Sequence, residues 1–359
     1  MPKYQDVFEA LRSRIVAGEF RRGERLPSEA KLVKQFGTSR ITVGRAVREL
    51  QQEGLVERRV GSGTYVRGGR AEPGGLLFGL LIPDLGRTEI FEPICQGMAR
   101  APRARPHALL WGNLPEGAGS EEEQALELCR QYIARGVSGV FFAPFELTPE
   151  RDAINARITE ALDRAGIPMV LLDRCVARYP RRSRYDLVGI DNRRAGYLVT
   201  EHLLERGCRR IAFIGLPDSA STVDARIAGY REALQAYGAP ADATLVERMD
   251  PSEPARVREL MEQCWPQGFV CANDRTAAHL MQSLLGLGYR IPDHLRLAGI
   301  DDVEYARLLP VPLTTLRQPC QEMGAAAVSA MLDRIAHPEM PARDILLDCK
   351  LIVRQSSGG

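Results

Sequence analysis

Residues 26–50 read LPSEAKLVKQFGTSRITVGRAVREL and contain two short amphipathic segments separated by Gly37. Apolar residues recur at helical spacing on both sides of this glycine, so the pattern predicts two helices joined by a tight turn. Gly37 can end the first helix, and Thr38 or Ser39 can cap the second by accepting a hydrogen bond from a backbone N–H group. This geometry suits insertion of the second helix into a DNA major groove, although any small helical hairpin shares the pattern.

The apolar positions predict the buried side of each helix. They are Leu32, Val33 and Phe36 in the first helix and Ile41, Val43, Ala46, Val47 and Leu50 in the second. The first turn of the second helix also carries Ser39, Arg40 and Thr42, whose hydroxyl and guanidinium groups suit contacts with base edges and phosphates. We therefore interpret the second helix as a candidate recognition helix for double-stranded DNA.

The flanking segments extend this helical pair to a complete small fold. Upstream, a further helix is predicted up to Gly18, with its apolar stripe at Val7, Phe8, Leu11, Ile15 and Val16. Ser28 can cap the next helix, and Gly54 ends the third. Residues 55–59 and 64–67 predict two strands around a glycine-containing turn at 60–63. Three helices followed by a basic hairpin predict a winged helix-turn-helix.

Charge is distributed unevenly along the chain. Residues 1–70 contain 15 lysines and arginines against 8 aspartates and glutamates, a net charge of +7. The remaining residues contain 33 against 38, a net charge of −5, so the whole chain carries +2. A basic unit in front of an acidic one favours a polyanionic partner for the basic unit, while such an excess is also common on solvated surfaces.

These residues carry a family resemblance. Residues 22–66, RGERLPSEAKLVKQFGTSRITVGRAVRELQQEGLVERRVGSGTYV, closely resemble the DNA-binding domain of the gluconate-repressor (GntR) family of bacterial transcription factors. The combination of LPSE, SRxTV, EGL and GxGTYV carries the match. The family usually has arginine where this chain has Gly44, and glycine inside a helix costs about 1 kcal/mol relative to alanine. Either Arg45 covers the same DNA backbone, or the protein reads a different operator.

The resemblance implies DNA contacts at three places. Ser39, Arg40 and Thr42 would lie at the groove, Arg45 and Arg48 would reach phosphates, and the wing tip would enter the minor groove. The full candidate set is Ser28, Glu29, Ser39, Arg40, Thr42, Arg45, Arg48, Gly61, Ser62, Gly63 and Thr64.

The chain divides into three parts. Residues 1–67 form the predicted DNA-binding domain, residues 68–75 a linker rich in glycine and proline, and residues 76–354 a larger α/β domain. Predicted strands lie at residues 76–83, 108–112, 139–144 and 168–173 and, in a second series, at 187–191, 210–215, 244–249, 268–272 and 295–301. Predicted helices alternate with them near residues 90–100, 121–135, 152–165, 192–206, 223–237 and 274–287. Two successive series predict two α/β lobes with doubly wound parallel sheets.

Polar residues cluster where these strands end. Because ligands of open α/β sheets bind outside the carboxyl ends of the strands, two facing lobes form a cleft lined by such residues. They are Asp84, Asp173, Arg226, Asn273, Asp301 and Gln318. Carboxylates, amides and one guanidinium suit a polyhydroxylated ligand, because each hydroxyl can both donate and accept a hydrogen bond. For Asn273 or Asp301 alone, a role as a helix cap is a competing explanation.

A second resemblance covers this larger domain. From residue 76 to residue 354 the chain looks like the effector-binding domain of the lactose-repressor (LacI) family, carried by DNRRAGYLVTEHLLERGCRRIAFIG and GFVCANDRTAAHLMQSLLGLGYRIPDHLRLAGIDDVEYARLLP. The resemblance implies that five of these residues contact the ligand, namely Asp173, Arg226, Asn273, Asp301 and Gln318. It also implies three crossovers between the lobes, packing of residues 320–336 on the first lobe, and a final strand of the second lobe at residues 345–353. The layout is similar to that of the arabinose-repressor subgroup.

The leading interpretation is a cytoplasmic, dimeric repressor that leaves a palindromic operator when a small sugar closes the cleft. A pentose is the favoured effector, with a nucleoside or purine as the alternative, and Phe91, Trp111, Phe142 and Trp265 are candidates for stacking on a sugar. An α/β enzyme or a solute-binding protein is the competing class. Asp173, His202 or His279 could serve such an enzyme as acid or base, but we find no phosphate loop or nucleophile elbow.

Cysteine spacing argues against a zinc protein, and hydropathy argues against a membrane or secreted protein. None of the eight cysteines forms a CxxC pair, which favours reduced, buried thiols over a zinc site, and we expect no metal or cofactor. The apolar runs are too short to span a bilayer, and the first residues lack the pattern of a secretion signal.

Overall fold

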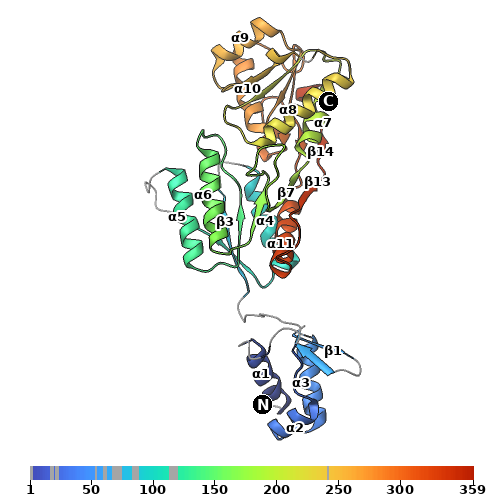
Figure 1. Ribbon diagram of the computed structural model, residues 1–359. Helices are drawn as coiled ribbons and strands as arrows, with labels where there is room; N and C mark the ends of the chain where they lie inside the picture. Colours follow the sequence, from blue (N-terminus) through green and yellow to red (C-terminus); the bar gives the residue numbers. More distant parts are fainter. Residues whose placement is uncertain are drawn as a thin grey trace. The chain divides into compact units, whose positions relative to one another are not determined.

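The computed structural model describes residues 3–16, 20, 24–52, 55–59, 63–66, 75–82, 89–112, 120–240 and 242–359. The chain separates into two compact units, Met1–Leu76 and Leu77–Gly359 (Figure 1). Residues 68–74 of the expected linker lie outside the described residues, so the limits that we gave for it stay a prediction. Each unit is described by itself below.

The first unit has the element order of a winged helix-turn-helix. Its elements are α1 (Lys3–Val16), α2 (Glu29–Phe36), α3 (Arg40–Gln52), β1 (Val56–Arg59) and β2 (Gly63–Val66). The two strands are antiparallel, with Val56 opposite Val66. Ser28 caps α2, Gly37 ends it in the left-handed conformation with φ 59°, and Ser39 accepts a hydrogen bond from the Thr42 backbone N–H at 3.2 Å. Gly18 and Gly54, the other expected helix ends, lie outside the described residues.

One hydrophobic core holds this unit together. It includes Val7, Leu11, Ile15, Leu32, Val43, Ala46, Val47 and Leu50. Our prediction that Ile41 joins this core is wrong, because its side chain is 82% exposed. Ile41 precedes Val43 by two residues, which places the two side chains about 200° apart around a helix with about 100° per residue. Val43 faces the core, and Ile41 therefore faces outward.

In the residues that the structure describes, the second unit has two six-stranded sheets, one in each lobe. The first sheet has the order β13 (Asp344–Leu347), β7 (Asp186–Ile190), β6 (Met169–Leu172), β5 (Gly139–Phe142), β3 (Leu77–Leu81) and β4 (Ala108–Trp111). The second has the order β14 (Lys350–Ile352), β12 (Thr314–Arg317), β11 (Arg296–Asp301), β10 (Gly268–Cys271), β8 (Ile211–Gly215) and β9 (Val246–Arg248). Neighbouring strands are parallel except β12 and β14.

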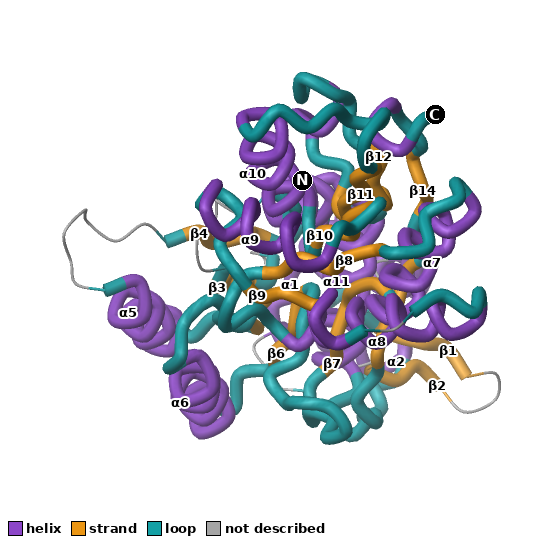
Figure 2. The backbone as a smooth tube through the Cα atoms, turned by 90° about the horizontal axis from the view of Figure 1, so that it is seen from above, coloured by secondary structure: helices purple, strands orange, loops and turns teal. Residues whose placement is uncertain are grey.

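Helices cover both faces of each sheet. The first lobe carries α4 (Phe91–Arg100), α5 (Glu121–Ala134), α6 (Arg151–Arg164) and α11 (Cys320–Ala336), and the second carries α7 (Asn192–Glu205), α8 (Ser221–Ala236), α9 (Pro254–Cys264) and α10 (Asp274–Gly286). Figure 1 shows α5 and α6 on one side of the first sheet and α4 and α11 on the other. Figure 2 shows α9 and α10 separated from α7 by the strands of the second sheet. Short 3-10 turns lie at Pro102–Ala104, Ala243–Leu245, Glu304–Arg307 and Gln355–Ser357.

The chain passes between the lobes three times, as the resemblance implied. The crossings follow β7, β12 and β13. Helix α11 packs on α4 and on the first sheet, which confirms its expected position. Two strand assignments were wrong. Strand β7, which we placed in the second series, belongs to the first sheet, and the expected single strand at 345–353 is divided between β13 in the first sheet and β14 in the second.

Candidate effector site and nucleic-acid interface

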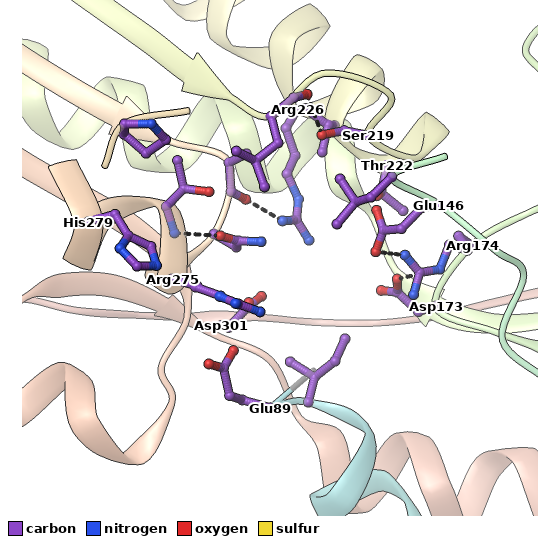
Figure 3. Close-up of a pocket in the computed structure, with 18 of the residues that line it drawn as sticks. Glu89, Glu146, Asp173, Arg174, Ser219, Thr222, Arg226, Arg275, His279 and Asp301 are labelled. Atoms are coloured by element: carbon purple, nitrogen blue, oxygen red, sulfur yellow. Dashed lines mark hydrogen bonds and ion pairs between the residues drawn. The ribbon is translucent and has the colours of Figure 1, made fainter. Parts of the chain in front are cut away.

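A cavity of about 400 Å³ lies between the two lobes, where strands of both sheets end. The first lobe contributes residues before α4 and after β5 and β6. The second contributes residues after β8, β9 and β10, the last residue of β11, and residues of α8 and α10. Figure 3 shows the polar side chains converging on this space. They include Glu89, Glu146, Asp173, Arg174, Ser219, Thr222, Arg226, Asp250, Asn273, Arg275, His279 and Asp301.

Asp173 follows β6 and is buried, with 6% of its surface exposed. Its Oδ2 lies 3.6 Å from Nε of Arg174, whereas its Oδ1 has no hydrogen-bond partner among the described residues. Burial raises the pKa of this carboxyl to about 6, against the opposing effect of the nearby Arg226. A buried acceptor without a partner costs about 1–3 kcal/mol, so this oxygen suits a hydroxyl supplied by a ligand.

Arg226 enters the cavity from α8 (Figure 3). Its Nε donates a hydrogen bond to Oδ1 of Asn192 at 2.8 Å, and its Nη1 donates to the carbonyl of Ala272. These bonds orient the guanidinium at the cavity wall. The backbone of Arg226 lies so close to α7 that a Cβ at Gly196 would collide with its carbonyl oxygen. Gly196 therefore permits the helix contact that places Arg226.

Asp301 ends β11 at the cavity. Burial raises the pKa of its carboxyl to about 7, while Arg226 and the amide of Gln318 lower it. Asp173 and Asp301 both have positive φ values, 66° and 131°. Such backbone conformations cost on the order of 1–3 kcal/mol for a residue other than glycine. The fold thus places two carboxylate residues with strained backbone conformations at one cavity.

Gln318 reaches the cavity only through Asp301. Its Nε2 donates to Oδ1 of Asp301 at 2.7 Å. Gln318 does not line the 400 Å³ cavity but a neighbouring cavity of about 340 Å³ that shares Asp301. Direct contact of Gln318 with a ligand in the first cavity therefore lacks support from the geometry.

Asn273 is both a helix cap and part of the cavity wall. It caps α10, because its Oδ1 accepts a hydrogen bond from the Thr276 backbone N–H at 2.8 Å, and it also lines the cavity. The next residue, Asp274, is fully buried and accepts hydrogen bonds from Thr315 at 2.5 Å and from the Val303 N–H at 3.0 Å. Burial, together with the charge of Asp301, raises the pKa of Asp274 to about 8. Asp84, the remaining expected ligand contact, lies outside the described residues.

Sequence reasoning missed part of the first-lobe wall. Arg174 forms an ion pair with Glu146, and its guanidinium lies 5.4 Å from the ring centre of Phe91. Glu146 and Glu89 stand in loops several residues beyond the strand ends, so strand-end position gives no signal for them. The arrangement provides acceptors and donors on both walls, as a polyhydroxylated ligand requires.

One of the four candidate stacking residues lines the cavity. Phe91 does so, whereas Trp111 and Trp265 are 54% and 70% exposed elsewhere on the second unit, and Phe142 is buried in the first-lobe core. The two histidines considered as acid or base are separated. His279 lines the cavity, while His202 is buried with its Nε2 2.8 Å from Oγ of Ser357.

The expected DNA-binding residues of the first unit fall into two groups. Several have partners within the unit. Ser28 accepts from the Lys31 N–H at 3.3 Å, Glu29 pairs with Arg58 at 3.4 Å, and the hydroxyls of Ser39 and Thr42 lie 2.8 Å apart. These contacts stabilise the starts of α2 and α3. The DNA contacts that we expect of the same residues stay predictions.

The arginines and the wing form the second group. Arg40 is exposed in the first turn of α3, and Nε of Arg48 donates to the Gly44 carbonyl at 3.3 Å. The guanidinium of Arg45 lies 3.8 Å from the ring centre of Tyr4. Gly63 and Thr64 begin β2, and Gly61 and Ser62 lie outside the described residues.

Among the described residues, no group of three or more histidine, cysteine or acidic side chains is arranged to hold a metal ion. All eight cysteines are free thiols. In the part of the chain that the structure describes, no helix combines the length and the hydropathy needed to cross a membrane.

Comparison with known proteins gives matches in both units. Residues 3–66 match the bacterial regulatory proteins of the gntR family, and residues 200–357 match the periplasmic binding protein-like domain. The arabinose metabolism transcriptional repressor of Geobacillus stearothermophilus is 30% identical over 370 residues, which cover 99% of this chain and 98% of the repressor. The ribose operon repressor of Halalkalibacterium halodurans is 26% identical over 285 residues, which cover 79% of this chain and 80% of that repressor.

A solved structure of a transcription regulator is similar to the second unit. The LacI family transcriptional regulator from Enterococcus faecium, solved with bound ribose, is 25% identical, with a TM-score of 0.63 and coverage of 78% of this chain and 98% of that one. The matching families and relatives are transcription regulators rather than enzymes. The chain therefore belongs to the GntR family of bacterial DNA-binding transcription regulators, in the arrangement that joins a winged helix-turn-helix to a periplasmic binding protein-like effector domain.

Proposed function

We propose that this protein is a cytoplasmic repressor that dissociates from a palindromic operator when a monosaccharide, most simply a pentose, occupies the cavity between the lobes. Cytoplasmic action follows from its DNA-binding role. The observation that carries the proposal is the unpartnered, buried Oδ1 of Asp173 opposite the oriented guanidinium of Arg226 in a cavity with a second carboxylate at Asp301. Each group can bond a sugar hydroxyl, and the acceptor of Asp173 is left unsatisfied without one.

The size of the cavity supports a small effector. At about 400 Å³ it lies near the lower end of the range for ligand sites, which begins at about 300 Å³. The described lining residues include one phenyl ring and no tyrosine or tryptophan, and that ring already has the Arg174 guanidinium near it. A purine or nucleoside gains most from stacking between aromatic side chains, so this lining favours a sugar. The names of the arabinose and ribose repressors among the relatives support a pentose.

The two-lobed architecture provides the route from effector to DNA. A sugar bonded to Asp173 in the first lobe and to Arg226 and Asp301 in the second stabilises a closed relation between the lobes. A ligand shifts an equilibrium only by its difference in affinity for the two states, and contacts on both walls supply that difference. In a homodimer, a change between lobes alters the spacing of the two DNA-binding units, and a palindromic operator requires one defined spacing.

The experiment combines ligand screening with DNA release. Thermal unfolding of the full chain is measured with pentoses, hexoses and nucleosides, because a compound that binds the folded state raises Tm. Operators are selected from random duplex DNA, and release is followed by fluorescence anisotropy as the stabilising compound is added. We expect a pentose both to raise Tm and to release the operator. Stabilisation by nucleosides alone would overturn the sugar assignment, and tighter operator binding would overturn release.

A further inference from the structure

An apolar side chain stands on the outer face of the recognition helix. Ile41, in the first turn of α3, is 82% exposed and contributes nothing to the core that Val43, Ala46, Val47 and Leu50 form. One turn later, Gly44 has only open space where a Cβ would lie. The outward surface of α3 at positions 41 and 44 therefore consists of one branched hydrocarbon side chain and bare backbone. We call this pair of positions the apolar face of α3.

Cationic side chains flank the apolar face without covering it. Arg40 precedes it and Arg48 follows it, with Nε of Arg48 bonded to the Gly44 carbonyl at 3.3 Å. Arg45 is directed elsewhere, because its guanidinium lies 3.8 Å from the Tyr4 ring centre and its Nε 3.5 Å from Oε1 of Glu49. Arg45 thus does not extend over position 44. A hydrocarbon surface flanked by arginines fits a DNA groove better than it fits an acidic or a basic protein surface.

We infer that Ile41 reads thymine methyl groups in the major groove and that Gly44 lets the backbone of α3 approach the bases. Only thymine presents a methyl group in that groove, and an apolar side chain distinguishes it by contact. Arginine, in contrast, reads guanine through two acceptors. Gly44 offers no side chain that could bond guanine, and Ile41 is exposed, so both positions move the preference of this helix toward A·T pairs. This inference rests on the DNA-binding function and specifies its base preference.

Replacing thymine by deoxyuridine removes the methyl group and nothing else. In the selected operator, each thymine is replaced in turn, and the Kd of the full chain is measured by fluorescence anisotropy at constant salt. We expect one position in each half-site to weaken wild-type binding by about fourfold, which corresponds to the roughly 0.8 kcal/mol of one buried methyl-sized group. The Ile41→Ala variant should bind the parent operator more weakly and lose sensitivity to deoxyuridine at that same position.

Two further variants complete the test. Leu308→Ala removes a comparably exposed side chain, 72% exposed, from the second unit and should retain the wild-type deoxyuridine profile. Gly44→Arg should select operators richer in guanine. Specific binding that tolerates deoxyuridine at every position, or an Ile41→Ala variant as sensitive as wild type, would overturn the inference. Absence of any sequence-preferring binding would instead contradict the DNA-binding function itself, so the two failures are distinguishable.

Discussion

Nε2 of Gln318 donates a hydrogen bond to Oδ1 of Asp301 at 2.7 Å, and this bond connects the cavity to a crossing between the lobes. Asp301 ends β11 at the cavity, and Gln318 lies between β12 and α11, where the chain returns to the first lobe. A ligand that bonds Asp301 therefore acts on a carboxylate already bonded to a segment that joins the two lobes.

Replacing Gln318 tests this connection. Gln318→Leu removes the bond and should weaken effector binding by about tenfold, since a hydrogen bond to a charged group contributes roughly 1.5–3 kcal/mol and a water can replace part of it. Isothermal titration calorimetry gives the affinity. Gln321→Leu, at an exposed position in the first turn of α11, is the matched control and should bind as wild type does. Equal affinities of the two variants would exclude a positioning role for Gln318.

Asp173 should cost the protein stability at neutral pH. Its pKa is raised from 3.8 to about 6, so the folded state favours the protonated carboxyl, and the stability present at low pH is lost as pH rises through about 6. At ~1.4 kcal/mol per pKa unit, the cost is roughly 3 kcal/mol above pH 7. Asp173→Asn should raise the free energy of unfolding at pH 8 by about 1–3 kcal/mol while abolishing effector binding.

Chemical denaturation at pH 5 and pH 8 measures this effect. The difference in stability between Asp173→Asn and wild type should be larger at pH 8 than at pH 5. Asp293→Asn, at a surface position of the second lobe, should show no such dependence. An Asp173→Asn variant less stable than wild type at pH 8 would show that the carboxylate is satisfied within the protein and needs no ligand.

His202 should limit stability on the acidic side. Burial, followed by the charge of Arg206, lowers its pKa below 6.5, and only Glu205 opposes them. The neutral ring that contacts Ser357 therefore contributes stability above pH 6.5, and this is lost as pH falls toward the folded-state pKa. His202→Gln can keep a bond to Ser357 and should reduce the loss of unfolding free energy between pH 7.5 and 5.5. The exposed His337 provides the control, and equal pH dependence of His202→Gln and His337→Gln would contradict this assignment.

Two glycines in helices should respond oppositely to alanine. A Cβ at Gly196 would collide with the carbonyl of Arg226, whereas a Cβ at Gly44 would meet nothing within 4 Å. Gly196→Ala should destabilise the second unit by about 1–3 kcal/mol and weaken effector binding, because overpacking moves the helix that carries Arg226. Gly44→Ala should stabilise the first unit by about 0.5–1 kcal/mol through helix propensity alone. Thermal unfolding followed by circular dichroism checks both, and a stabilising Gly196→Ala would contradict close packing of α7 and α8.

The sequence predicted local structure better than pairing between distant strands. Helical spacing, Ser28 and Gly37 defined α2 because each signal acts within one or two turns. Strand β7 was assigned to the wrong lobe because its partners, β6 and β13, lie at very different distances along the chain, and no local pattern records such pairing. Ile41 was placed in the core because it was grouped with the apolar residues of α3, although its position lies about 200° from that of Val43 around the helix.

The sequence also predicted part of the cavity lining and missed the rest. Asp173, Arg226, Asn273 and Asp301 line one cavity as the strand-end rule suggested, since parallel strands bring their carboxyl ends together. Gln318 was expected to touch the ligand, but its contact through Asp301 depends on side-chain geometry. Glu89 and Glu146 reach the cavity from loops, where the position of a residue in the sequence does not determine which way its side chain points.

The central claim is that the cavity controls DNA binding, and operator release tests it most directly. Complexes of a labelled operator with wild type, Asp301→Ala and the surface variant Asp293→Asn are titrated with the stabilising sugar, and fluorescence anisotropy reports release. We predict equal operator affinity for all three without sugar. Release of Asp301→Ala should require roughly a hundredfold more sugar than wild type and Asp293→Asn, because losing a buried hydrogen-bonded carboxylate costs about 3 kcal/mol. Release of all three proteins at the same sugar concentration would contradict the account.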